Sequence, residues 1–337
     1  MNSLLTISDL KVYFPYGKTG WFGKPAGYVK AVDGVSFEIR RGETLGLVGE
    51  SGSGKTTLGR AVLRALEPTG GEITYHRDGA SIDIMGLDRG ALRKMWRHMQ
   101  MIFQDPYSSL NPRMTVRDVL SEPLIANKLA KGAELKQRVI DIARRCGLNI
   151  EHLSRYPHAF SGGQRQRIAI ARALVMHPEF IVCDEPVSAL DVSIQAQILN
   201  LLKDLQQQLN LTFLFIAHDL AAVAYICDRV AVMYLGQIVE VAPTEALYYS
   251  PRHPYTEALM SAIPEADPSQ TMKPLLLEGE RPSPANPPAG CRFHTRCRYA
   301  MQICRESQPP LQEGAAGHFV ACHPAGDLTL QGALEQE

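Results

Sequence analysis

The sequence lacks an excess of charge of either sign. Its 337 residues carry 35 Lys and Arg and 35 Asp and Glu, so that the net charge is +0 at pH 7. Proteins that bind nucleic acid non-specifically present a basic surface. The balanced charge therefore gives no reason to expect a nucleic-acid partner.

The sequence also lacks an uninterrupted apolar run that could cross a membrane. Its most apolar long stretch, residues 211–236, is broken by His218, Asp219, Asp228 and Arg229, and such residues are costly inside a bilayer. A basic-then-apolar signal region is absent from the N-terminus, and we find no internal repeat. We therefore expect a cytosolic chain, and its length of 337 residues suggests about two domains.

Residues 49–56 read Gly-Glu-Ser-Gly-Ser-Gly-Lys-Thr, the G-x-x-x-x-G-K-[ST] pattern of a phosphate-binding loop. A strand-length apolar run precedes the loop and a helix-forming stretch, residues 57–66, follows it. Glycines let backbone N–H groups cradle phosphates, and the N-terminus of the new helix attracts negative charge. Lys55 can reach the β- and γ-phosphates, and the Thr56 hydroxyl can bind Mg²⁺. A Gly- and Ser-rich turn that fits by chance is the alternative. The predicted nucleotide-binding residues here are Gly49, Glu50, Ser51, Gly52, Ser53, Gly54, Lys55, Thr56 and Thr57.

Asp184 and Glu185 close a continuous apolar run, residues 180–183. Asp184 can hold Mg²⁺, and Glu185 can polarise the water that attacks a phosphate. The alternative is a pair of solvated acidic residues after a core strand. The pair is weak evidence alone, but it follows a complete phosphate-binding loop at a distance that suits an NTPase.

Alternating strands and helices predict an α/β fold around a P-loop sheet. Apolar runs such as 180–183 and 212–217 are typical of parallel strands that are buried on both faces. Alternating apolar residues within 4–48 indicate an antiparallel β layer in front of the loop. We expect helices at 165–174, which Ser161 can cap, and 192–209, a helix-forming segment at about 116–147, and a hairpin at 230–241.

Phe160-Ser161-Gly162-Gly163-Gln164 resembles the signature motif of ATP-binding-cassette (ABC) ATPases. Three further elements appear in that family's order: a Q-loop glutamine, Gln104, a D-loop at 188–191 that ends in Asp191, and a switch histidine, His218. The resemblance spans about residues 4–325. A core histidine would be the default interpretation of His218 without these partners.

Membership implies a site shared by two cassettes that face head to tail. ATP then lies between the phosphate-binding loop of one chain and Ser161, Gly162, Gly163 and Gln164 of the other. The resemblance implies catalytic roles for Glu185, His218 and Gln104, Mg²⁺ binding by Thr56, Gln104 and Asp184, and a nucleotide contact by Asp191. Phe14 aligns with the aromatic that stacks on adenine, but Tyr13, Tyr28 or a purely structural role for Phe14 are alternatives.

Other motifs narrow the resemblance to ATPase subunits of dipeptide, oligopeptide and nickel importers. They are Gln104-Asp105-Pro106, residues 109–113, residues 155–158 and residues 251–256. The similarity is greatest to the second ATPase subunit of dipeptide importers. It implies an ATPase that powers peptide import, with nickel or another small solute, or a soluble ABC protein that does not transport, as alternatives. An exporter ATPase is a third class, usually fused to membrane spans.

The same resemblance implies partners and a location. The expected partners are a homologous second ATPase subunit in a heterodimer, two integral membrane permeases and a periplasmic or extracellular solute-binding protein. The expected location is the cytoplasmic face of the bacterial inner membrane, as a peripheral subunit. We expect an ABC ATPase domain at 4–262 with a helical signature subdomain at about 105–175. A Pro-rich arm with a small Cys-containing C-terminal extension at 263–325 and a polar tail at 326–337 complete the chain.

Four of the seven cysteines lie in the C-terminal part. The gaps in Cys291-x5-Cys297-x6-Cys304-x17-Cys322 are longer than the C-x₂₋₄-C pairs of structural zinc sites. Four thiolates suit an iron–sulfur cluster, and the resemblance points to [4Fe–4S]. Zinc, unrelated thiols and replacement of one ligand by a nearby histidine are the alternatives. We expect the other three, Cys146, Cys183 and Cys227, in the apolar core.

Overall fold

The computed structural model describes residues 3–17, 25–263 and 275–333. Contacts divide the chain into two compact units, and we describe each by itself. The described residues of the first unit are 3–4, 39–44 and 84–216, and those of the second lie in 5–38, 45–83 and 217–333.

The first unit contains a parallel sheet and most of the helices of the middle of the chain. Strand β7 pairs in parallel with β6 on one side and with β8 on the other. Strands β7 and β8 are completely buried, as their continuous apolar runs predict. The elements are α2 (Arg89–Met95), β6 (Met99–Ile102), α3 (Pro106–Ser109), α4 (Val116–Ala126), α5 (Gly132–Arg145), η1 (Ile150–His152), η2 (Pro157–Ala159), α6 (Gly162–Leu174), β7 (Phe180–Asp184), α7 (Val192–Leu209) and β8 (Thr212–Ile216).

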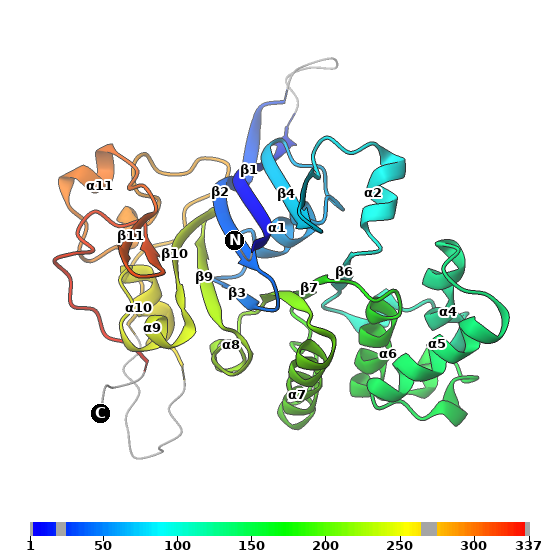
Figure 1. Cartoon of the computed structure of the whole chain (residues 1–337). Coiled ribbons are helices and arrows are strands. Elements are labelled where there is room, and N and C mark those ends of the chain that lie inside the picture. Colours follow the sequence, from blue (N-terminus) through cyan, green and yellow to red (C-terminus); the bar gives the residue numbers. More distant parts are fainter. Residues whose placement is uncertain (1–2, 18–24, 264–274, 334–337) are drawn as a thin grey trace. The chain divides into compact units, whose positions relative to one another are not determined.

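Helices α4, α5 and α6 of the first unit lie side by side (Figure 1). The segment 116–147 forms two helices, because Lys128, between them, has a φ angle of 55° and Gly132, the first residue of α5, has one of 59°, which the interior of a right-handed helix does not contain. A capping box of Thr115 and Asp118 starts α4. Ser161 caps helix α6, as predicted, and the helix begins at Gly162 rather than at Arg165.

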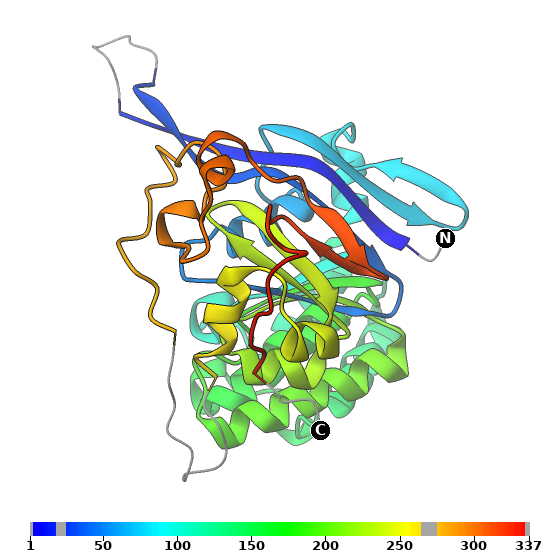
Figure 2. The ribbon, with the colours of Figure 1, turned by 90° about the vertical axis from the view of Figure 1, so that its left-hand side faces the viewer.

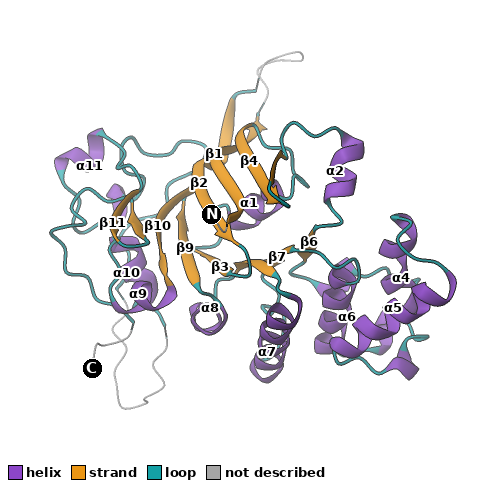
Figure 3. Cartoon of the chain, in the orientation of Figure 1, coloured by secondary structure: helices purple, strands orange, loops and turns teal. Residues whose placement is uncertain are grey.

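The second unit contains an antiparallel sheet with the strand order β2-β1-β4-β5, and Figure 3 shows β2, β1 and β4 as neighbouring strands. Residues such as Ile7 on β1 and Ile73 on β4 pair directly and are buried. The predicted antiparallel layer is therefore present. Its elements, and those between them, are β1 (Ser3–Tyr16), β2 (Gly27–Arg40), β3 (Thr44–Val48), α1 (Lys55–Val62), β4 (Gly70–Arg77) and β5 (Ala80–Asp83).

A second group of strands in this unit pairs in the order β3, β9, β10, β12, β11. Strands β3 and β9 are parallel, and the remaining pairs are antiparallel. The predicted hairpin is confirmed as β9 and β10. Its turn residues Leu235 and Gly236 both have positive φ angles, which is the geometry of a tight hairpin turn.

The C-terminal segment, which we define as residues 275–333, adds β12 and β11 beside β10 (Figure 2). The remaining elements of the second unit are α8 (Leu220–Ile226), β9 (Arg229–Tyr234), β10 (Gln237–Pro243), α9 (Thr244–Tyr249), α10 (Pro254–Met260), η3 (His294–Arg296), α11 (Gln302–Glu306), β11 (Gln312–Ala315) and β12 (His318–Val320).

Three cysteines, Cys146, Cys183 and Cys227, are buried as expected. Burial raises the pKa of the Cys146 thiol to about 12, so that it stays protonated at neutral pH and acts as a small core residue. Among the residues that the structure describes, no helix combines the length and the apolar character of a membrane span.

Candidate functional site

The phosphate-binding loop joins β3 to α1 in the second unit, which confirms the predicted context. Its three glycines all have backbone angles that L side chains rarely adopt, with φ of 148° at Gly49, 73° at Gly52 and 111° at Gly54. A Cβ atom at Gly49 would lie 2.1 Å from the carbonyl oxygen of Met233, and one at Gly54 would lie 2.1 Å from that of Ala31. Only glycine fits either position, so the path of the loop backbone depends on these two glycines.

Lys55 is the first residue of α1 and its side chain folds back over the loop. The ammonium donates to the carbonyl oxygens of Gly49 at 2.7 Å and Glu50 at 2.9 Å, and the residue is only 5% exposed. The backbone N–H of Ser53 also donates to the Glu50 carbonyl. The loop is therefore a closed turn with a buried positive charge at its centre, which suits a phosphate group.

Residues far along the chain also hold this loop, and the sequence patterns did not reveal them. The backbone N–H of Glu50 donates to the hydroxyl of Tyr255 at 2.8 Å. Arg296 donates to both carboxylate oxygens of Glu50 at 3.1 Å, and Arg281 donates to the carbonyl of Ser51. Tyr255 lies in a stretch that the family resemblance singled out, but nothing in that pattern indicates its partner.

The aromatic residues proposed for adenine lie on β1 and β2 of the second unit. The Tyr13 hydroxyl donates to the carboxylate of Asp33, and burial together with this bond raises the pKa of Tyr13 to about 12. Phe14 and Tyr28 are 39% and 47% exposed, so that both rings remain accessible and Phe14 is not a core residue. Stacking of Phe14 on adenine stays a prediction.

Gln104, Asp184 and Glu185 lie together in the first unit. Asp184 is the last residue of β7 and is 2% exposed. The side-chain amide of Gln104, two residues beyond β6, donates to the Glu185 carboxylate at 2.7 Å. Glu185 has a φ of 48°, a strained conformation that is concentrated at functional sites. The structure thus joins the predicted Q-loop glutamine and the predicted base in one hydrogen bond.

The signature residues form the start of α6. The Ser161 hydroxyl accepts from the backbone N–H of Gln164, and the Gln164 side chain accepts from the N–H of Ser161, which is a capping box. A Cβ atom at Gly163 would lie 2.5 Å from the side chain of Ile194. The Asp191 carboxylate caps α7 by accepting from the backbone N–H of Ile194 at 3.0 Å. The signature motif and the D-loop therefore meet where α6 and α7 begin.

The two units divide the predicted site residues between them. Gln104, Asp184, Glu185, the signature residues and Asp191 belong to the first unit, whereas residues 49–57, Phe14 and His218 belong to the second. His218 immediately precedes Asp219, which caps α8. The predicted sharing of Mg²⁺ by Thr56, Gln104 and Asp184 joins residues of both units and stays a prediction.

The predicted iron–sulfur cluster is wrong. Cys291, Cys297, Cys304 and Cys322 line one cavity, but its space of about 10 Å³ has room for roughly one water molecule. In the described part of the chain, no group of three or more His, Cys, Asp or Glu side chains could hold a metal ion. Burial raises the pKa of Cys297 to about 11 and of Cys322 to about 12. Cysteine spacing could not show this burial.

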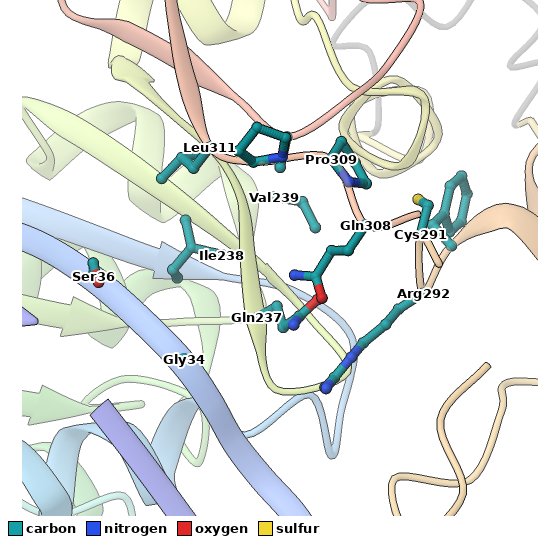
Figure 4. A pocket seen from close by; sticks show the side chains of 13 residues that line it. Gly34, Ser36, Gln237, Ile238, Val239, Cys291, Arg292, Gln308, Pro309 and Leu311 are labelled. Carbon is teal, nitrogen blue, oxygen red and sulfur yellow. The ribbon is translucent and has the colours of Figure 1, made fainter. Parts of the chain in front are cut away.

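A separate cavity of about 340 Å³ lies between the C-terminal segment, β2 and the β9–β10 hairpin. Figure 4 shows the side chains of Gln237 and Gln308 close to each other on one side of it, with Arg292 beside them. Arg292 donates to the carbonyl of Leu235 and to the carboxylate of Asp33. The C-terminal segment is therefore anchored at the hairpin turn, whose Gly236 N–H donates to the carbonyl of Ser53 in the phosphate-binding loop at 2.8 Å.

Comparison with protein families gives two matches. Residues 32–188 match the family described as ABC transporter. Residues 239–304 match the family described as oligopeptide/dipeptide transporter, C-terminal region.

Curated relatives match along nearly their whole length. The oligopeptide transport ATP-binding protein AppF of Bacillus subtilis is 51% identical over 96% of this chain and 97% of its own. The putative oligopeptide transport ATP-binding protein YkfD of the same organism is 54% identical, with 95% of each chain covered. The probable peptide ABC transporter ATP-binding protein y4tS of Sinorhizobium fredii is 49% identical over 96% of this chain and 90% of its own.

Solved structures show the same fold. The ATP-binding cassette MJ0796, in a dimeric post-hydrolysis state bound to ADP and Pi, superposes with a TM-score of 0.62. It is 27% identical and covers 71% of this chain and 98% of its own. The cbiO1 protein of Clostridium perfringens, part of a cbiONQ transporter complex, gives a TM-score of 0.61 at 28% identity, covering 74% of this chain and 91% of its own.

Proposed function

Since this chain belongs to the ABC transporter family of ATP-binding proteins, we propose that it hydrolyses ATP to power the import of peptides. The observation that carries the proposal is its identity of 49–54% to three relatives named for peptide or oligopeptide transport, over 95–96% of its length. The chain has the α/β P-loop fold of ABC ATPases, with an antiparallel sheet. ATP and Mg²⁺ are the substrate and the ion that this family uses.

The phosphate-binding loop fits the substrate. Its glycines leave no room for side chains at Gly49 and Gly54, and Lys55 places a buried ammonium at its centre. We assign the β- and γ-phosphates to this loop, with Thr56 as a Mg²⁺ ligand. Phe14 is the residue that we assign to adenine.

Hydrolysis needs a base near the γ-phosphate, because water is a weak nucleophile. Glu185 is assigned this role, and the hydrogen bond from Gln104 orients its carboxylate. Together with Thr56, Asp184 and Gln104 would hold Mg²⁺, which would supply charge stabilisation for the transferred phosphoryl group. His218 acts as the switch residue that senses the γ-phosphate.

The proposal includes a second cassette and membrane partners. Ser161, Gly162, Gly163 and Gln164 start a helix whose N-terminal N–H groups suit an anion, and we assign them with Asp191 to the ATP held by a partner chain. The partner chain is a homologous but different ATPase. The conformational change that ATP causes in the two cassettes is transmitted to two permeases. A solute-binding protein delivers the peptide, and this chain lies peripherally at the cytoplasmic face of the bacterial inner membrane.

The proposed domains follow the roles. Residues 4–262 form the ATPase, with the helical part at about 105–175 toward the permeases. Residues 263–325 form a Cys-containing extension and 326–337 a polar tail; residues 264–274 and 334–337 lie outside the described ones.

Reconstitution tests the solute and the assembly. The chain is co-expressed with the permeases, the second ATPase and the solute-binding protein of its transporter, and ATP hydrolysis is measured in proteoliposomes. We expect stimulation by peptide-loaded binding protein and none by nickel. Stimulation by nickel alone would replace peptide as the solute. A purified active complex with two copies of this chain and no second ATPase would refute the heteromer.

A further inference from the structure

Glu50 is the residue through which the phosphate-binding loop is held from outside. Its carbonyl oxygen accepts from the Lys55 ammonium at 2.9 Å and from Ser53 N–H at 3.1 Å. Its backbone N–H donates to Tyr255 at 2.8 Å. Hydrogen bonds therefore fix the peptide groups on both sides of Glu50. They also fix the position of the Glu50 carbonyl, which is one of the two carbonyls that bind the Lys55 ammonium.

Arg296 of the C-terminal segment grips the side chain of the same residue. One of its guanidinium nitrogens, Nη1, lies 3.1 Å from each carboxylate oxygen of Glu50. The Arg296 side chain is 9% exposed and that of Glu50 is 27% exposed, so that solvent screens this ion pair less than a surface pair. The contact joins two residues that lie 246 positions apart.

The packing around Arg296 makes the grip rigid. Phe293, in the same stretch, is 2% exposed and lies edge-on to Tyr234, with ring centroids 5.2 Å apart. It also contacts the ring of Tyr255 at 5.4 Å, the residue that holds the Glu50 backbone. This aromatic cluster thus packs the C-terminal segment against Tyr255. It stabilises both residues that bind Glu50, Tyr255 at its backbone and Arg296 at its side chain.

We propose that Arg296 is a positioning residue for the phosphate-binding loop, holding Lys55 through Glu50, so that the C-terminal segment sets the affinity of the loop for nucleotide. The proposal rests on the proposed function, because it takes the loop to bind ATP. Arg296 does not touch the substrate. It acts by keeping the loop backbone in the conformation in which Lys55 and the N–H groups face the phosphates, and it therefore lowers the entropic cost of binding.

The proposal predicts a particular kinetic change in Arg296→Gln. A loop that is less ordered loses affinity for the ground state and the transition state alike, which raises KM and leaves kcat unchanged. We expect KM for ATP, and the dissociation constant for ADP by calorimetry, to rise about three- to tenfold, the factor that corresponds to the net contribution of a typical hydrogen bond. We expect kcat to stay within about twofold, because no group that contacts the reacting atoms is removed.

Three further variants test the route through Glu50. Glu50→Gln should raise KM by a similar factor, and the double variant should be no worse than either single one, because both remove the same interaction. Arg296→Lys keeps the charge but replaces the guanidinium Nη1 with an ammonium on a more flexible side chain, and its KM should fall between those of Arg296→Gln and the unsubstituted chain. These variants also keep the test informative if Arg296→Gln folds poorly.

Arg298→Gln is the matched control, because it removes an ion pair from the same stretch that does not involve the loop. Arg298 donates to Glu257 at 3.0 Å. This control should lower the melting temperature without changing KM. A KM for Arg296→Gln within twofold of the unsubstituted chain, an equal rise in Arg298→Gln, or additive effects in the double variant would each overturn the proposal. Failure of the unsubstituted full chain to bind ADP or ATP would instead reject the proposed function.

Discussion

Glu185 combines a strained backbone with a defined hydrogen bond, and both properties suit a catalytic base. Its φ of 48° is uncommon for a residue with a side chain, and such strain persists where the surrounding structure enforces it. Its backbone N–H donates to the Ile216 carbonyl at 3.0 Å, and Gln104 holds its carboxylate. Residues at the ends of the two neighbouring strands, β8 and β6, thereby fix the orientation of the Glu185 side chain.

Glu185→Gln should abolish turnover and leave nucleotide binding intact. The amide keeps the shape and can still accept from Gln104, but it cannot take a proton, so that phosphate release should fall by about 10²–10⁴-fold. Phosphate release and ADP affinity are measured on the same preparation. Glu179→Gln is the control, because Glu179 is another carboxylate of this unit and pairs with Arg41 at 3.0 Å. If Glu185→Gln hydrolysed ATP at a near-normal rate beside an inactive partner cassette, Glu185 would not be the catalytic base.

Gly163 should be the less replaceable of the two signature glycines. A Cβ atom there would meet the Ile194 side chain at 2.5 Å, whereas one at Gly162 would meet Leu190 at an ordinary 3.4 Å. Gly163→Ala should therefore destabilise the fold by about 1–3 kcal/mol through overpacking, and Gly162→Ala by clearly less. Thermal unfolding of both variants measures this difference. Equal melting temperatures would show that Ile194 moves aside at no cost.

The residues that sequence analysis identified are those whose role is local in the chain. Gly54, Lys55 and Ser161 act on backbone groups within a few positions of themselves, so that the spacing of residues in the sequence is enough to predict their roles. Arg296 and Tyr255 act on Glu50 from more than 200 residues away, and only the fold brings them there. The spacing of the four C-terminal cysteines predicted a metal cluster, but spacing does not encode how little space lies between the folded side chains, about 10 Å³ in the cavity that they line.

Among the elements, buried strands were easier to predict than helix boundaries. Strands β7 and β8 follow from continuous apolar runs, and the β9–β10 hairpin follows from the glycine between two such runs. The break between α4 and α5 has no proline to mark it, and it depends on left-handed angles at Lys128 and Gly132. Helix α1 ends at Val62 although helix-forming residues continue to Leu66, because Arg64 adopts a φ of 49°.

His253 is the element-scale feature with a pH-dependent consequence. It caps α10 by accepting from the backbone N–H of Tyr255 at 3.0 Å, and it is 1% exposed. Burial lowers its pKa from 6.5 to about 3. Because the unfolded chain binds a proton that the folded chain refuses, stability is complete above pH 6.5 and is lost as the pH falls from 6.5 toward 3.

His253→Asn should weaken this acid sensitivity, since asparagine can cap a helix but does not titrate. Between pH 7.5 and 5 the unsubstituted chain should lose about 2 kcal/mol more stability than the variant. Thermal unfolding at both pH values gives the comparison, and His158→Asn, at an exposed histidine, is the control. An identical pH dependence of the two proteins would contradict the buried neutral state of His253.

At the scale of the whole molecule, the loop's ligand should be visible as a change in global stability. A ligand that binds only the folded state stabilises it by about 2.7 kcal/mol at a concentration of 100 times its dissociation constant. For a chain of 337 residues we expect a rise in melting temperature of about 4 °C, because an unfolding entropy of roughly 2.1 cal/mol/K per residue gives about 1.4 °C per kcal/mol. ADP with Mg²⁺ should therefore shift the transition of the unsubstituted chain.

Lys55→Ala should abolish that shift, because it removes the ammonium that the loop places among its own carbonyls. The variant should still fold, since loss of the side chain leaves the loop glycines and the Tyr255 contact in place. Lys136→Ala, at an exposed lysine on α5, removes the same charge and should retain the full shift. If ADP with Mg²⁺ raised the melting temperature of Lys55→Ala by as much as that of the unsubstituted chain, the nucleotide would bind outside the phosphate-binding loop. The chemistry that we assign to this loop would then be wrong.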